Sequence, residues 1–366
     1  MSRYREGSAH RSGAFPRTAA FNATDREVGQ QAELPDQDRH EIGLLLRGES
    51  VIDWHRLYVE TPEQARRLFA LNGFDPDDVN DRERLTKLRQ RSISYLVNTL
   101  KLRISDYVAT EAPLWELPLL ASRSNRDQRF ACVLLKVMHI IYHLDARELR
   151  TQLAISDSDL FGLVEASMAE LVDELRSAGV PLAEFSWSRK THDSLVTKLL
   201  VKPTTRAARV FDRLRFRLVV QEPHDLGPAL HVMLHRCIPF NYVIPGQTVN
   251  SLVAFDDTGK GSSARDLVQV RAVAPNAAAT ENEFSAGNFR VLNFVADLPV
   301  RVDDLLPDHR PDAPSTVFVL SEFQVIDEAT NAANDEGPSA HALYKSRQHA
   351  RVRERLLRAP STSKGE

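Results

Sequence analysis

Apolar positions in the first half of the chain recur at helical spacing. The clearest example spans residues 129–150. Its apolar residues form a stripe along one helical face, made of Phe130, Val133, Leu134, Val137, Ile141 and Leu144. A second helix is predicted with Thr61 as its cap, Pro62 in its first turn and Gly73 at its end. These patterns predict an all-helical first domain.

Short apolar runs alternate with helical segments beyond Pro181. We expect strands at 216–221, 266–274, 289–296 and 316–325, and a helix at 225–236. This alternation predicts one mixed sheet flanked by helices, so the whole chain should be an α+β protein. The predicted divisions are a flexible segment (1–38), a helical domain (39–182), a mixed domain (183–346) and a basic C-terminal helix and tail (347–366).

Composition is that of an ordinary globular protein, with 366 residues of which 42% are hydrophobic and 27% charged. The formal net charge of −3 predicts no bulk attraction to nucleic acid. No apolar run is long enough to span a membrane, and the first residues lack the apolar core of a signal peptide, so we expect a cytoplasmic protein. Cys132 and Cys237 are the only cysteines, which argues against a disulfide framework or a thiolate metal site.

Candidate chemistry is concentrated between residues 188 and 220. Lys190, Ser194 and Lys198 recur every four residues, so on a helix they would share one face that could hold a polyphosphate. Taken alone, the same pattern is typical of the solvent-exposed face of an amphipathic helix. Asp212 then opens an apolar strand and offers a carboxylate that suits Mg²⁺, with Arg217 five residues on, on the opposite face of an ideal strand.

This stretch resembles the synthetase domain of the RelA/SpoT family, which transfers pyrophosphate from ATP to the 3′ hydroxyl of GDP or GTP. Two downstream segments extend the resemblance over about residues 185–346. Glu322 and Gln324 in VLSEFQV look like the family's catalytic strand, and EGPSAHALYK at 336–345 looks like the helix that follows it. The resemblance implies a nucleotidyltransferase-like fold.

The resemblance also implies roles for single residues. Asp212 and Glu322 would share Mg²⁺, and Glu322 would also orient or deprotonate the acceptor hydroxyl. Phe289 would stack on the acceptor base. Lys190, Lys198 and Arg217 would hold the phosphates of ATP. Ser194 would orient a phosphate or cap its helix, and Gln324 would also belong to the nucleotide-binding residues.

Several positions depart from the family pattern, mostly on the acceptor side. Ser188 stands where the family has an arginine, and Arg189 is one residue out of register. Further departures are Asn250 for Asp, Asn288 for Gly, Val291 for Ser, Asn293 for His and Ile326 for Arg. The residues expected to bind the metal ion and ATP match the family pattern better than those expected to bind the acceptor. This difference predicts an altered acceptor or a protein that only binds nucleotide.

The function expected is an ATP-dependent pyrophosphokinase that acts on a guanosine nucleotide or an RNA 3′ end. The alternative is a catalytically inactive nucleotide- or RNA-binding regulator of the same fold. From Leu343 onward the chain has seven lysines and arginines and only two glutamates, so this basic tail could contact RNA or be a solvated surface. The helical domain would regulate the activity or bind a partner.

Two other possibilities follow from histidines. His139, His143 and Asp145 could form a helical metal site, although the spacing fixes no third ligand. The larger RelA/SpoT relatives carry a hydrolase domain marked by a His-Asp dipeptide, and none occurs here before residue 190. Hydrolase activity is therefore not expected.

Overall fold

The computed structural model describes residues 34–49, 57–201, 214–255, 263–270, 289–305, 313–335 and 341–357. Within these ranges the side chains of Lys198, Val201 and residues 341–344 are not described. Asp212 and residues 336–340, which the sequence placed in the candidate site, lie outside the described residues. None of the helices in the described ranges combines the length and the apolar character that crossing a membrane requires.

Helices make up the first half of the described chain. They are α2 (Asp36–Arg47), α3 (Pro62–Leu71), α4 (Val79–Ser94), η2 (Tyr95–Thr99), η3 (Tyr107–Glu111), η4 (Leu114–Glu116), α5 (Leu117–Ser122), α6 (Gln128–Gln152) and α7 (Asp157–Ser177). The predicted start of α3 is confirmed: Thr61 Oγ1 accepts a bond from the Gln64 amide, and the Gln64 side chain accepts one from the Thr61 amide. Gly73 follows the helix with φ at +86°, a conformation that favours glycine.

Strands and helices alternate in the second half. They are β1 (Leu182–Arg189), α8 (His192–Val201), β2 (Leu214–Val220), η6 (Pro223–Asp225), α9 (Leu226–Arg236), η7 (Phe240–Tyr242), β3 (Val249–Asn250), β4 (Val253–Phe255), α10 (Ala264–Leu267), β5 (Val268–Val270), β6 (Leu292–Arg301), η8 (Asp303–Leu305), β7 (Thr316–Asp327), α11 (Glu328–Asp335) and α12 (His341–Leu357). The predicted α+β class, with a helical first half followed by one main sheet, is confirmed.

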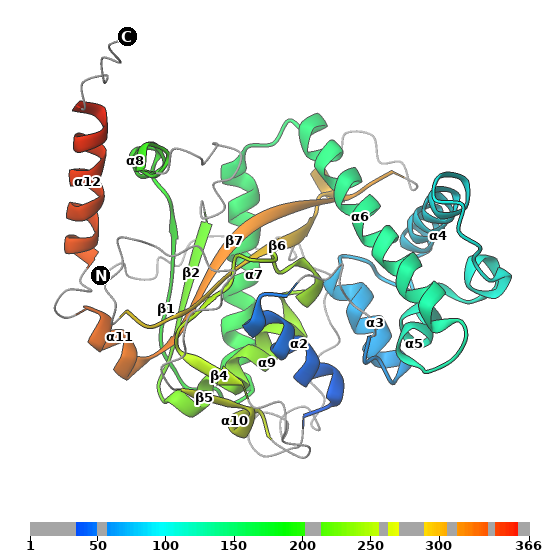
Figure 1. Ribbon diagram of the computed structural model, residues 1–366, viewed down its shortest axis with the longest axis horizontal. Coiled ribbons are helices and arrows are strands. Elements are labelled where there is room, and N and C mark those ends of the chain that lie inside the picture. The colour runs from blue at the N-terminus through cyan, green and yellow to red at the C-terminus, as the bar shows by residue number, and fades with distance from the viewer. Residues whose placement is uncertain are drawn as a thin grey trace, which may run out of the picture.

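The main sheet has five strands in the order β1-β2-β7-β6-β3. Strands β2 and β7 are parallel, and the other neighbours are antiparallel, so the sheet is mixed as predicted. Strands β6 and β7 are the longest and cross the molecule as one twisted ribbon (Figure 1). Strands β4 and β5 form a separate two-stranded sheet.

Alternation along the central strands gives the sheet one apolar face. Phe216, Phe323 and Phe294 lie side by side on β2, β7 and β6, with ring centroids 5.5 and 5.2 Å apart. All three are buried. Helix α7 lies behind the sheet in Figure 1 and, like α9, packs against it. Burying three phenylalanines on one face stabilises the sheet and leaves the other face for polar side chains.

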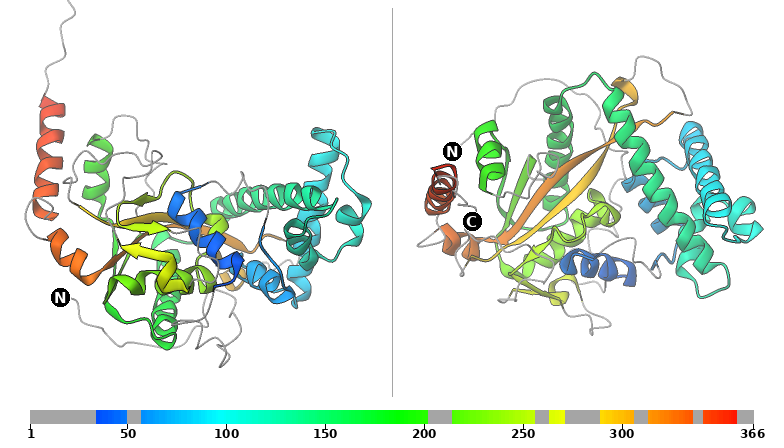
Figure 2. Two further views of the ribbon diagram at one scale, coloured as in Figure 1. Left: turned by 60° about the horizontal axis from the view of Figure 1, so that its bottom comes forward. Right: turned by 45° about the horizontal axis from the view of Figure 1, so that its top comes forward.

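Helices α3 to α6 gather at one end of the molecule, and α11 and α12 lie at the opposite end (Figure 2). Ion pairs fasten α4 to the end of β6. Arg84 binds Asp81 at 2.7 Å and Asp303 at 2.8 Å, and Arg301 reaches the same Asp81 at 2.5 Å. A single core cluster of buried apolar residues continues from the helices into the sheet.

Two predictions about local structure were wrong. The predicted basic helix does not begin near Ser188, because Ser188 and Arg189 end strand β1, where they pair with β2. Helix α8 begins at His192, with Thr191 Oγ1 accepting a bond from the Ser194 amide, so Lys190 precedes the helix.

The strand predicted from residue 266 begins later, at Val268. At the start of the short helix α10, the Asp266 carboxylate accepts bonds from the Ser263 amide at 3.2 Å and from the Ser263 hydroxyl at 2.7 Å. This cap favours helical over extended backbone at the start of the predicted run.

Candidate functional site

Five polar side chains project from the face of the sheet opposite the phenylalanines. Arg215 and Arg217 of β2 pair in register with Glu322 and Gln324 of β7, and Asn293 of β6 pairs with Gln324. Residues paired across neighbouring strands point to the same side of a sheet. We call these five residues the polar face.

Glu322 is the centre of the polar face. Arg215 donates to its Oε2 from Nε at 3.0 Å and from Nη2 at 2.9 Å, and Asn293 Nδ2 donates to its Oε1 at 2.6 Å. Glu322 is only 5% exposed, so this carboxylate depends on these donors for the hydrogen bonds that water would otherwise give. Both oxygens are held in place by groups from neighbouring strands.

Arg215 remains accessible even though its partner is buried, because its side chain is 35% exposed. Arg217 donates to Asn331 of α11, the helix that follows β7. Gln324 is half-buried between the two strands that carry Arg217 and Asn293. The polar face therefore presents two guanidinium groups to an incoming anion, beside one fixed carboxylate.

The structure brings Glu322, Gln324 and Arg217 together, as the resemblance implied for one site. Ser194 lies on α8, which packs beside α12, and its hydroxyl is 3.0 Å from Thr191 Oγ1. Phe289 is half-buried just before β6, and its carbonyl accepts a bond from Arg290. The side chains of Lys198 and Asp212 are outside the description, so their roles remain predictions.

Two members of the polar face were missed as functional residues. The signal that identifies Arg215 is the alternation in LRFRLVV, which places it on the same face as Arg217. Asn293 departs from the family pattern, and its bond to Glu322 depends on a pairing of β6 with β7 that the sequence does not specify. Arg189, by contrast, binds Glu165 of α7 at 2.6 and 2.8 Å.

The proposed helical metal site around His139 is not assembled. His139 Nδ1 lies 3.3 Å from the Asn241 amide nitrogen, and His143 Nε2 lies 3.5 Å from Asp297. Asp145 binds Arg91 instead. Burial lowers the pKa of His139 to about 4, so this ring is neutral near pH 7.

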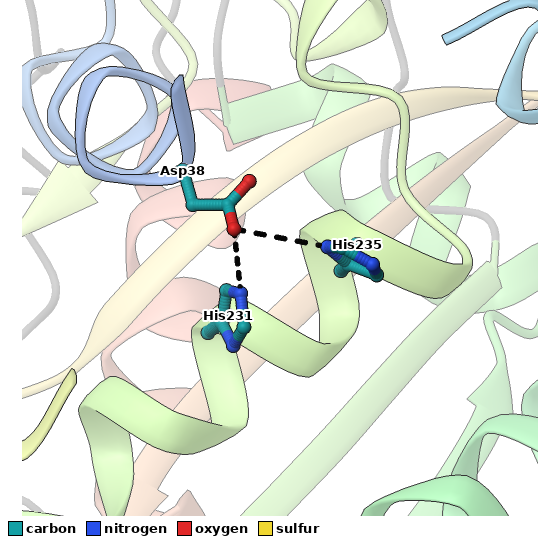
Figure 3. A group of neighbouring side chains, drawn as sticks. All are labelled: Asp38, His231 and His235. Atoms are coloured by element: carbon teal, nitrogen blue, oxygen red, sulfur yellow. Dashed lines mark hydrogen bonds and ion pairs between the residues drawn. The ribbon is translucent and has the colours of Figure 1, made fainter. Parts of the chain in front are cut away.

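A second carboxylate cluster joins α2 to α9 (Figure 3). Asp38 Oδ2 lies 2.9 Å from His231 Nε2 and 3.8 Å from His235 Nδ1, and these groups are close enough to share a metal ion. However, Arg67 of α3 donates to Asp38 Oδ1 at 2.8 Å and also contacts His235. The guanidinium already supplies the positive charge that a metal ion would bring.

The electrostatics of this cluster fit that interpretation. Burial raises the pKa of Asp38, but Arg67 and His231 outweigh burial and bring it below its usual range. Burial raises the pKa of neighbouring Glu41 to about 7, and burial together with Arg67 lowers the pKa of His235 to about 2. Near pH 7 the buried Asp38 carboxylate is therefore ionised and paired with the Arg67 guanidinium. We interpret the cluster as a fastening between helices.

Comparison with known proteins gives a likeness to solved structures alone. No family model matches the chain. No curated protein matches it. The chain is similar to structures of GTP pyrophosphokinases and alarmone synthetases.

The likeness covers about half of this chain. A GTP pyrophosphokinase family protein from Streptococcus pneumoniae is 14% identical over 54% of this chain and 83% of its own, with a TM-score of 0.29. Small alarmone synthetase 2 from Bacillus subtilis is 13% identical over 54% and 90%, also at 0.29. Small alarmone synthetase 1 from the same organism, bound to AMPCPP, is 10% identical over 54% and 85%, at 0.28. Function is therefore proposed below from the polar face itself.

Proposed function

We propose that the polar face binds ATP and transfers its terminal pyrophosphate to a hydroxyl group of a guanosine nucleotide or of an RNA 3′ end. The observation that carries this proposal is the fixed position of Glu322 between Arg215 and Asn293, next to Arg217. A buried, oriented carboxylate beside two guanidinium groups provides a proton acceptor and phosphate-binding donors within one site.

Glu322 can also serve as one ligand of Mg²⁺. Its Oε1 accepts the bond from Asn293, and a carboxylate oxygen has a second lone pair that can face a metal ion. Glu322 together with Asp212 would hold the ion. When bound, Mg²⁺ would neutralise negative charge on the phosphates of ATP.

In the proposed step, the acceptor hydroxyl oxygen attacks the β-phosphorus of ATP. A new bond forms between that oxygen and the β-phosphorus, and the bond from the β-phosphorus to the oxygen bridging the α-phosphate breaks, so AMP leaves. Glu322 accepts the hydroxyl proton. Arg217 and Arg215 bind phosphate oxygens, where a planar guanidinium can contact two oxygens at once.

The proposal is tested by incubating the purified protein with Mg²⁺, γ-labelled ATP and, separately, GDP, GTP or tRNA. Label retained on an acceptor is the expected result. Glu322→Gln should lower the transfer rate by about 10²–10⁴-fold, because the amide keeps the shape of the side chain but cannot take the proton. Glu184→Gln, at an exposed position of β1, is the matched control and should leave the rate unchanged.

A second candidate function is nucleotide binding without turnover. The ion pair between Arg215 and Glu322 favours it, because that cation occupies one side of the carboxylate that the reaction needs. In that case wild-type protein binds ATP and transfers no label to any acceptor. Equal ATP affinities of wild type and Glu322→Gln, with no transfer by either protein, would establish this second function over the first.

A further inference from the structure

An apolar cavity lies among the helices at one end of the molecule. Its volume is about 80 Å³, and its walls come from α3, α4, α5, α6 and η7. Leu68, Leu85, Leu88 and Met138 supply much of the apolar wall. A cavity of this kind has room for more than one water molecule, but an apolar wall gives water few partners.

One end of the cavity is polar. Asn241 donates to the Asn72 side chain at 2.7 Å, and the neutral His139 lies beside the same Asn241. The Tyr242 ring packs against His139 at a tilt of 32°, with ring centroids 4.7 Å apart. The polar end is thus built from amides, a neutral imidazole and a phenol, and Lys136 is the one charged side chain among the lining residues.

The Tyr242 hydroxyl is buried and has no hydrogen-bond partner in the part of the chain that the structure describes. A buried hydroxyl without a partner loses the hydrogen bonds that water gives it in the unfolded chain. The side chain is 3% exposed, so bulk water does not satisfy it. A ligand group that reaches this hydroxyl would recover that loss.

We propose that this cavity binds a small, uncharged, mainly apolar molecule that carries one hydroxyl or carbonyl group. The apolar body would lie against the leucines and Met138, and the polar group would meet Tyr242 and His139. Binding here does not depend on the function proposed for the polar face.

The position of the cavity predicts that a bound molecule stabilises the folded protein. Residues Asn241 and Tyr242 belong to η7, and two residues later the Ile244 amide donates to the Val295 carbonyl of β6 at 2.8 Å. A bound molecule would therefore contact α4, α6 and a segment joined directly to β6. The cavity exists in the folded state alone, so a bound molecule would raise the thermal stability.

Three probes of one ring size test the proposed ligand class: benzyl alcohol, toluene and benzoate. Calorimetric titration should give saturable benzyl alcohol binding, with Kd on the order of 0.1–1 mM for so small a ligand. Toluene should bind about threefold to tenfold more weakly, because it cannot bond Tyr242. Tighter binding of benzoate than of benzyl alcohol would overturn the uncharged class, and no saturable binding of any probe would overturn the site.

Location is tested with methyl-labelled methionine, of which the chain has four. Benzyl alcohol should shift the methyl resonance of Met138, which lines the cavity. Met168 and Met233 are buried elsewhere in the core and serve as internal controls. Equal shifts at all three would mean that binding is non-specific.

Two variants then test the two ends of the cavity. Tyr242→Phe should weaken benzyl alcohol binding about threefold to tenfold and leave toluene binding unchanged. Leu135→Phe should narrow the cavity and weaken both probes, whereas Leu149→Phe, on the same helix but away from the cavity, should weaken neither. Unchanged binding in both cavity variants would contradict the proposal.

Discussion

Glu322 and Asp38 are both buried carboxylates, and each is held by an arginine and by a second nitrogen-bearing side chain, Asn293 for Glu322 and His231 for Asp38. They differ in how far the arginine is removed from water. The Arg215 side chain beside Glu322 is 35% exposed, whereas the Arg67 side chain beside Asp38 is 10% exposed. A ligand can compete for the first arginine but not for the second. The same pairing can therefore form either a binding site or a fastening between helices.

Removing the buried arginine should have the largest effect. Arg67→Met leaves Asp38 buried without its cation, so we expect the free energy of unfolding to fall by about 3–5 kcal/mol. Urea unfolding followed by circular dichroism measures this loss. A loss below about 1 kcal/mol would mean that the cluster is no stronger than a surface ion pair.

The pH dependence of stability should reveal the raised pKa of Glu41. Its pKa is about 7 in the folded protein and 4.5 for an ordinary solvated glutamate, so Glu41 favours the folded state below pH 4.5, and this contribution is lost as pH rises towards 7. Glu41→Gln removes that loss. Its stability relative to wild type should increase by about 1–3 kcal/mol between pH 4.5 and 7.5.

Urea unfolding of wild type and Glu41→Gln at several pH values measures whether the stability of the variant relative to wild type rises with pH. The comparison between proteins is needed because His235 acts in the opposite direction. Its pKa is lowered to about 2, so its contribution is present above pH 6.5 and is lost as pH falls. A stability difference that does not change with pH would contradict the raised pKa of Glu41.

The exposed arginines of the polar face should affect ligand binding more than stability. Arg217→Gln should weaken ATP binding about tenfold, because a charge-assisted contact to phosphate is lost. Calorimetric titration in the presence of Mg²⁺ measures the change. Arg176→Gln, an exposed substitution at the end of α7, is the control and should leave affinity unchanged.

Arg215→Met should have the smallest effect on stability. Water can reach the vacated side of Glu322, so we expect a loss of about 1 kcal/mol, well below that of Arg67→Met. Parallel urea unfolding of the two variants sharpens the comparison. Equal losses would show that exposure of the arginine does not distinguish the two carboxylates.

Local patterns were enough to predict much of the fold. Alternation in LRFRLVV and VLSEFQV predicted the two central strands, and the Thr61 cap predicted the start of α3. Strand β1 was missed. Much of it is exposed at the edge of the sheet, so it lacks the apolar run that marks a buried strand.

What the sequence determined by itself was set by contacts between near neighbours: the Thr61 helix cap and the face of a strand on which Arg215 and Arg217 both lie. The apolar stripe predicted along α6 was wrong in part, because the helix buries a face that includes Met138 and Tyr142 and leaves Leu144 exposed.

The tertiary structure alone decided which distant groups meet. Asp38 and His231 are 193 positions apart, and Asn293 reaches Glu322 through the pairing of β6 with β7. Short-range periodicity carries no record of such contacts, because they arise when whole elements pack to bury a common core.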